Sequence, residues 1–417
     1  MINRIFLIVI FILIEEILLR ILLRNFRRVS PGNSYPAVLN ILNNLINVGF
    51  AITTIVYFIQ NQDPGNNFVA YRNYFGLFNV FILIYFSKFI IVIIFLLGEL
   101  FRLTLWMWHR WFSSLKKLPL TRAFHIRRGF ALGGILAGLV FFAFALYGIL
   151  GGVNRFVVKH VDLYFPDLPA AFEGFTIAQI SDIHLGSWTH QEDVAKGIYL
   201  LENQKPDMVC ITGDIINVNS DETFPYKNLF AEIKAAYGKF AILGNHDMGD
   251  YTRFGRRDFS EHNIPGIKSF FDSTGFVLIR NSHVYIHKGK DSFALLGTDN
   301  WSMRKFKRYG KLNDALRGTK RSDFKVLMSH DPSHWRAQVM DSTSVNLMLS
   351  GHTHGMQLGI DLPWLRWSPV ALVLKEWMGL YQNRKQYLYV NAGFGFLGFS
   401  GRIGIPPEIT IITLHKQ

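Results

Sequence analysis

The stretch FTIAQISDIH at residues 175–184 is an apolar run that stops at Asp182 and His184, and four later runs stop in the same way. Short apolar runs closed by Gly, Asp or Asn are typical of buried strands that meet a loop. Loops at strand ends are where α/β folds carry their chemistry. The later runs stop at Gly213-Asp214, Gly244-Asn245-His246-Asp247, His330-Asp331-Pro332 and Gly351-His352-Thr353-His354.

The side chains at these junctions are Asp, Asn and His, with no thiolate among them. Such donors suit hard or borderline divalent metals bound through oxygen and nitrogen. The pattern therefore indicates a metal-dependent hydrolase. The single cysteine, Cys210, lies inside an apolar run, where we expect it to be a small buried hydrophobic residue.

The positive charge of the chain is concentrated at one end. Residues 1–160 carry 16 Lys and Arg against 4 Asp and Glu, whereas residues 161–417 carry 28 against 26. A nearly neutral second half lacks the basic footprint of a nucleic-acid partner. The basic excess instead belongs to a membrane region.

Four stretches in residues 1–150 are long and apolar enough for a bilayer, which needs about 20 residues. They lie at about residues 5–23, 38–59, 74–97 and 130–150. No small-residue cleavage site follows the first, so we interpret it as an anchor rather than a signal peptide. The sequence thus predicts an all-α transmembrane bundle of four helices, a linker at 151–173 and a catalytic domain at 174–417.

The basic residues also predict an orientation. Arg-rich and Lys-rich segments follow the first and third spans, and positive loops face the cytoplasm. We therefore expect a multi-pass protein of the cytoplasmic membrane with its catalytic domain outside. Glu15 and Glu16 fall within the first span, where they are either part of a proton or substrate path or simply neutralised by Arg20.

The five junctions, taken in order, resemble the calcineurin-like metallophosphoesterase superfamily over about residues 174–417. The distances of 30 residues from His184 to Asp214 and 31 from Asp214 to Asn245 fit strand-helix units. Residues 388–393 and 402–409 are similar to the C-terminal signature of a bacterial membrane-linked branch. The resemblance implies a four-layer α/β fold, in which two mixed sheets pack face to face between outer helices.

The resemblance also implies a role for each residue. Two divalent ions, of Mn, Fe, Zn or Mg, would be bridged by Asp214, and a hydroxide between them would attack phosphorus. His246 would donate to the leaving or a phosphoryl oxygen, and Asp247 would orient His246. The remaining ligands would be Asp182, His184 and His354 for the first ion, and Asn245, His330 and His352 for the second.

Residues 361–378 add apolar and aromatic bulk just after His354. This segment is either ordinary core or a cap that lies on the bilayer or holds an acyl chain. With the membrane tether, it favours lipid partners and a lipid-linked phosphoester or pyrophosphate as substrate. Two alternatives stay open: a cytoplasm-facing pyrophosphatase for a nucleotide-linked lipid such as UDP-diacylglucosamine, and a non-catalytic transporter or sensor.

Overall fold

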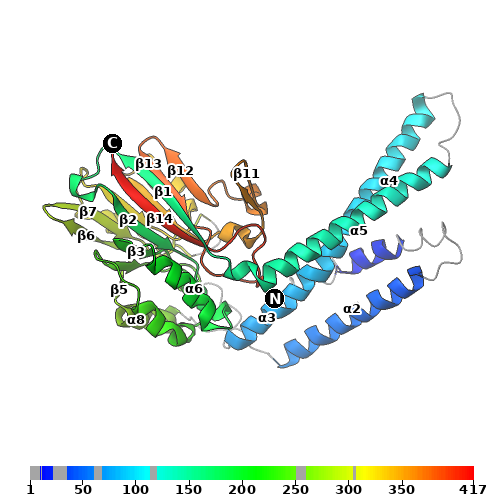
Figure 1. The fold of residues 1–417 in the computed structure, drawn as a ribbon, viewed down its shortest axis with the longest axis horizontal. Helices are drawn as coiled ribbons and strands as arrows, with labels where there is room; N and C mark the ends of the chain where they lie inside the picture. Colours follow the sequence, from blue (N-terminus) through cyan, green and yellow to red (C-terminus); the bar gives the residue numbers. More distant parts are fainter. Residues whose placement is uncertain are drawn as a thin grey trace. The chain divides into compact units, whose positions relative to one another are not determined.

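The structure is a computed structural model that describes residues 10, 12–21, 35–60, 68–112, 120–249, 260–303 and 307–417. The chain divides into two compact units. The first comprises residues 1–62 and 76–147, and the second comprises residues 63–75 and 148–417. Figure 1 shows the first as helices and the second as sheets with flanking helices.

The N-terminal region is helical. Helix α2 (Tyr35–Gln60) is followed by one continuous helical run in which a π-helical turn, η2 (Ile82–Phe86), joins α3 (Phe68–Phe81) to α4 (Ser87–Phe112). Helix α5 (Leu120–Leu150) completes the series. Among the described residues, two helical segments are long and apolar enough to cross a membrane, Phe75–Trp111 and His125–Leu150. They cover the third and fourth predicted spans, and the number of spans stays a prediction.

We expected the basic residues after the third predicted span to lie in a loop, but several of them lie in helices. Arg102 and Arg110 lie within α4, and Arg127 and Arg128 within α5. Arg102 and Arg127 both pair with Glu99, at 3.0 and 2.6 Å. Part of the positive charge is thus neutralised on the helices themselves, so the orientation also stays a prediction.

Glu16 has local partners. Arg20 Nε donates to its Oε1 at 2.9 Å, and the side chains of Asn43 and Asn47 donate to its Oε2 at 2.6 and 2.8 Å. This agrees with the interpretation of a carboxylate neutralised one helical turn away. It also gives the asparagines of α2 a hydrogen-bonding role.

The second unit contains two mixed sheets, as the resemblance implied, and the structure gives each of them six strands. In the first sheet, β2 to β5 are parallel, β14 runs antiparallel to β2, and β1 is parallel to β14. In the second, β13, β9, β8 and β7 are parallel, and β12 and β6 run antiparallel along the two edges. The first order is β1 (Val157–Phe165), β14 (Glu408–Lys416), β2 (Phe175–Ile180), β3 (Met208–Ile211), β4 (Lys239–Ala241), β5 (Phe276–Leu278). The second order is β12 (Gly379–Asn383), β13 (Gln386–Val390), β9 (Leu347–Ser350), β8 (Lys325–Met328), β7 (Asp291–Gly297), β6 (Ser282–Lys288).

The alternation of side chains along each strand builds the layers. Met208 and Cys210 of β3 join a core shared with residues of the second sheet, whereas Val209 and Ile211 face a core shared with helices. Both faces are buried, which explains why these strands are continuous apolar runs. The outer helices are α6 (Gln191–Glu202), α7 (Lys227–Ala231) and α8 (Ser260–Thr274) on the first sheet, and α9 (Leu312–Leu316) on the second (Figure 1).

Two segments differ from what we predicted from the sequence, the linker and the cap. The expected linker, 151–173, contains β1, which pairs with β14 along its whole length, so the catalytic unit begins before residue 174. The expected cap contains a separate antiparallel hairpin of β10 (Ile360–Leu362) and β11 (Leu365–Trp367), followed by a 3₁₀ turn, η9 (Pro369–Leu372). Lys159 stands on the inward side of β1, where an apolar residue would have extended the alternation of Val161, Leu163 and Phe165, so the strand was not recognised in the sequence.

Candidate metal centre

The predicted ligands lie at the carboxyl ends of strands from both sheets. Strands β2, β3 and β4 are parallel neighbours, so the loops that carry Asp182, Asp214 and Asn245 meet at one edge of the first sheet. Strands β8 and β9 lead in the same way to His330 and to the loop of His352 and His354. The backbone N–H of His352 donates to the Asp182 carboxylate at 2.9 Å, which joins the two sets of loops.

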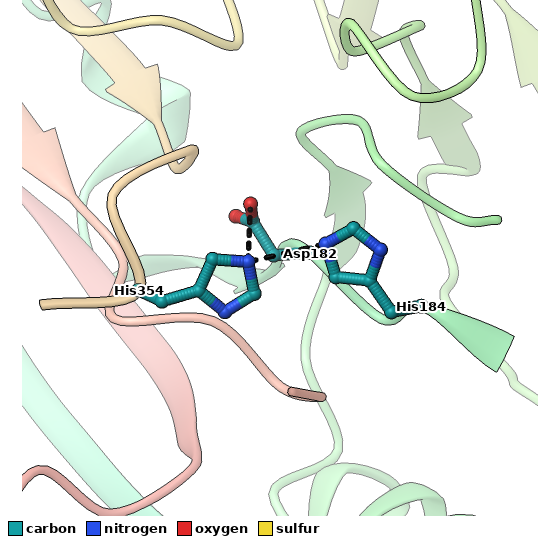
Figure 2. A group of neighbouring side chains, drawn as sticks. All are labelled: Asp182, His184 and His354. Atoms are coloured by element: carbon teal, nitrogen blue, oxygen red, sulfur yellow. Dashed lines mark hydrogen bonds and ion pairs between the residues drawn. The ribbon is translucent and has the colours of Figure 1, made fainter. Parts of the chain in front are cut away.

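The first group of donors is Asp182, His184 and His354, whose ligand atoms lie within 4.8 Å of one another. Figure 2 shows the three side chains converging, with dashed lines from the His354 ring to the Asp182 carboxylate and to the His184 ring. His354 Nε2 is 3.3 Å from Asp182 Oδ1 and 3.1 Å from His184 Nε2. The other ring nitrogen of His184, Nδ1, lies 3.2 Å from the carbonyl oxygen of Ile216, which fixes the ring.

A second group contains Asp214, His330 and His352. His330 Nε2 is 3.2 Å from Asp214 Oδ2, and its Nδ1 lies 2.8 Å from the carbonyl oxygen of Thr212. The same Asp214 oxygen is 3.8 Å from His184 Nε2. Asp214 therefore lies between the two groups, where a bridging carboxylate belongs.

Asn245 provides a test of whether these residues fit metal ions. Its side chain is fully buried, and within the described residues neither its Oδ1 nor its Nδ2 has a hydrogen-bond partner. Unpaired buried polar atoms are costly and rare unless something else binds them. Gly244, the residue before Asn245, lets the two ligand loops approach closely, because a Cβ at this position would lie 2.1 Å from Asp214 Oδ1. Asn245 and His330 thus suit a second ion beside Asp214.

Burial sets the charge of the histidines. It lowers the pKa of His184 to about 3, and it holds the pKa of His354 well below its usual value with help from His184 and Arg402. Both rings are therefore neutral and keep a lone pair for a metal. For His330, burial is outweighed by the Asp214 carboxylate, which raises the pKa to about 10. A site that attracts a proton this strongly also attracts a metal cation.

His246 lies beside this centre. Its backbone N–H donates to Asp214 Oδ1 at 2.9 Å, and its ring centroid is 4.9 Å from that of His184. Its Nδ1 lies 2.7 Å from the carbonyl oxygen of Asn217. Burial lowers the pKa of His246, so the ring is neutral with its proton directed at this carbonyl.

Asp247 does not have the role that we expected from the sequence. Its carboxylate accepts hydrogen bonds from the backbone N–H groups of Asp214, Ile215, Ile216 and Gly244, at 2.7 to 3.2 Å. The atom that orients His246 is instead the Asn217 carbonyl. Asp247 thus shapes the backbone of two ligand loops.

Two supporting carboxylates were missed. Glu222 is buried and accepts the backbone N–H groups of Gly186, Asn217, Val218 and Asn219, which fixes the segment that orients His246. Asp331 Oδ2 lies 3.6 Å from His352 Nε2. A carboxylate beside a ligand histidine helps to fix the orientation of its ring. The HDP sequence at residues 330–332 was the available signal for Asp331, and none marked Glu222.

Several ligands occupy an unusual backbone conformation. Asp182, His184, Asp214, His352 and His354 have φ between 49° and 73°, the left-handed region that few non-glycine residues adopt. Such strain gathers at functional sites. Met356 also has a φ of 59°, a conformation that glycine adopts more readily than methionine. Its side chain is 55% exposed.

The strand ends of the two sheets hold an aspartate among histidines and an asparagine, an arrangement consistent with the dinuclear metal site of a hydrolase. Comparison with protein families matches residues 175–356 to the calcineurin-like phosphoesterases. The chain is 32% identical over 260 residues to the metallophosphoesterase YkuE of Bacillus subtilis, covering 60% of this chain and 82% of that protein. It belongs to the calcineurin-like metallophosphoesterase superfamily and is a metal-dependent phosphoesterase.

The names of two further relatives mention a transmembrane protein and a pyrophosphatase. A transmembrane protein with a metallophosphoesterase domain from Danio rerio is 26% identical, with coverage of 68% of this chain and 62% of that protein. The UDP-2,3-diacylglucosamine pyrophosphatase LpxG of Chlamydia muridarum is 26% identical, with coverage of 62% and 89%.

Proposed function

We propose that this protein is a membrane-anchored phosphoesterase that hydrolyses a phosphoester or pyrophosphate bond in a lipid-linked substrate at the outer face of the cytoplasmic membrane. The observation that carries the proposal is that one chain combines the buried Asp and His centre with two helices apolar enough to span a bilayer. A tethered active site meets membrane lipids far more often than free nucleotides. The likeness to a protein named for a lipid pyrophosphatase supports the same substrate class.

The residues have distinct tasks in this reaction. Asp182, His184, Asp214 and His354 would hold one divalent ion, and Asp214, Asn245, His330 and His352 the other. When bound, such ions polarise phosphoryl oxygens and lower the pKa of water. The Asn217 carbonyl fixes the Nδ1 proton of His246, so any proton that His246 exchanges with substrate is carried at Nε2. Asp247 and Glu222 hold the loops that keep these groups in place.

One alternative has a specific observation in its favour. The likeness to LpxG suggests a cytoplasm-facing enzyme that cleaves a nucleotide-linked lipid of the UDP-diacylglucosamine type. Reporter enzymes fused after Gln417 separate the two. Activity of a reporter that works only outside the membrane supports the outward-facing site, and activity of a reporter that works only in the cytoplasm supports the alternative.

The substrate class is tested with the full chain reconstituted in nanodiscs and loaded separately with Mn, Fe, Zn or Mg. Bis-p-nitrophenyl phosphate is compared with phospholipids, lipid pyrophosphates and UDP-2,3-diacylglucosamine, with Asp214→Asn as the blank. Turnover of a lipid that is lost in the blank supports the proposal, and the preferred lipid identifies the substrate class. Turnover of bis-p-nitrophenyl phosphate with no lipid hydrolysed would overturn it.

A further inference from the structure

The segment of residues 360–373 presents large apolar side chains to solvent. Trp364 is 80% exposed, Leu372 81% and Val373 63%. Ile360, Leu362, Leu365 and Trp367 are exposed as well. Leucine and valine are normally buried, and contiguous exposed apolar side chains mark an interaction site. We refer to these seven residues as the apolar tip.

The apolar tip is held out by a built structure. Strands β10 and β11 pair in the register Ile360↔Trp367, Asp361↔Arg366 and Leu362↔Leu365, and Figure 1 shows this hairpin as a small ribbon separate from the two main sheets. Asp361 of β10 holds the hairpin in place. It accepts a hydrogen bond from Lys159 Nζ of β1 at 2.8 Å and one from Arg366 Nε of β11 at 3.1 Å. The exposure is therefore a property of a fixed element.

The segment is also joined to the loop that carries two metal ligands. Ser368 Oγ donates to the carbonyl oxygen of Gly355 at 2.8 Å. Thr353, between His352 and His354, donates through its hydroxyl to the carbonyl oxygen of Trp377. Whatever the apolar tip binds is thus brought to the neighbourhood of the metal centre.

The charges around the apolar tip favour one occupant. Asp361 and Glu376 are the two carboxylates of residues 359–378, and both are neutralised, Asp361 by Lys159 and Arg366 and Glu376 by Arg336. Lys375 is exposed beside them. Tryptophan and aliphatic side chains flanked by cations are the composition that binds the interface of an anionic bilayer. The spanning helices of the same chain keep such a surface within reach.

We propose that the apolar tip inserts into the interfacial layer of the lipid bilayer and so docks the catalytic unit on the membrane. This goes beyond the proposed function, because docking does not depend on which substrate is hydrolysed. It gives the apolar tip a role as a membrane-contact surface, whereas Trp377 and Met378 at the end of the same segment are buried in a small core.

Leu372→Cys in the full chain is labelled with an environment-sensitive fluorophore. The native Cys210 is buried, and burial raises the pKa of its thiol, so it does not compete for the reagent. The Asp214→Asn background keeps catalysis out of the measurement. Val373→Cys is a second label, and Tyr199→Cys, on α6 and 67% exposed, is the matched control.

In anionic nanodiscs we expect the labels at 372 and 373 to shift to the blue and to be quenched by lipids spin-labelled near the headgroup, with the label at 199 unchanged. Water-like emission without quenching at both positions would overturn the inference. A blue shift without lipid quenching would overturn it too, because the tip would then be covered by protein, either this chain or a second copy. Lipid hydrolysis by the same cysteine variants with Asp214 restored tests the proposed function separately, so either can fail alone.

Discussion

The metal centre and the apolar tip are close along the chain but opposite in physical character. At the centre, Asp182, His184, Asn245 and His330 are charged or polar and completely buried. Ten residues after His354, Trp364 is large, apolar and exposed. Burying charge and exposing apolar surface both cost free energy, so a fold selected for stability alone would contain neither. Their presence in one catalytic unit indicates two functions, metal chemistry in the interior and contact with a partner at the surface.

The largest effect should come from Asp214→Asn, which breaks the centre at the carboxylate that lies between the two donor groups. We expect hydrolysis of bis-p-nitrophenyl phosphate to fall by at least about a thousandfold, because metal ions contribute several kcal/mol to the transition state. Steady-state rates and metal content per chain measure the loss. Asp272→Asn, an exposed carboxylate on α8, is the control and should behave as wild type. Full activity in Asp214→Asn would contradict the assigned centre.

Asp331→Asn tests a carboxylate that acts through a ligand. Because Asp331 lies behind His352, we expect a loss of about 10-fold to 100-fold in metal affinity, with activity partly restored by excess metal. Metal titrations followed by activity distinguish this from a simple loss of folding, which excess metal would not repair. Asp341→Asn, at an exposed carboxylate, should leave the titration unchanged.

The Trp364→Ser, Trp367→Ser double variant tests the outer region. We expect kcat/KM for a lipid substrate to fall by at least about tenfold, since each apolar side chain loses roughly 1.5–3 kcal/mol of burial, whereas hydrolysis of bis-p-nitrophenyl phosphate is unchanged. Tyr199→Ser removes a similar exposed ring from α6 and serves as the control. Equal losses on both substrates would mean that the hairpin supports the metal centre rather than lipid access.

The sequence predicted the inner region better than the outer one. Five strand ends were recognised because apolar runs closed by Gly and a metal-binding side chain are local patterns, and the structure places Asp182, His184, Asp214, His330, His352 and His354 in its donor groups. A sixth junction, where β7 ends at Thr298-Asp299-Asn300, went unrecognised because it carries no histidine. Asp299 there is bound by Arg280.

Long-range contacts account for the remaining differences. Asp247 accepts backbone N–H groups that lie more than 30 residues earlier, and no local pattern reports such a partner. Strand β1 forms only because β14, from the far end of the chain, pairs with it. Likewise, apolar residues 361–378 fit either a core or a surface until the sheets they might cover are known.

The smallest effect should come from His415, a surface histidine whose side chain is 24% exposed, in contrast with the buried rings of the centre. Hydrogen bonds to Glu173 and Asp162 raise the pKa of His415 above its usual value. A pKa raised by folding stabilises the fold below the unfolded value of about 6.5, and this contribution is lost as pH rises through the raised value. The Tm difference between wild type and His415→Gln should therefore be positive near pH 6 and shrink at higher pH. A variant that keeps His415 but neutralises both carboxylates should show the same behaviour as His415→Gln. A Tm difference that does not change with pH would contradict the prediction, because it would mean that solvent screens the ion pairs of His415 until they add no stability. Folding would then control the protonation of the buried histidines of the centre but not that of His415.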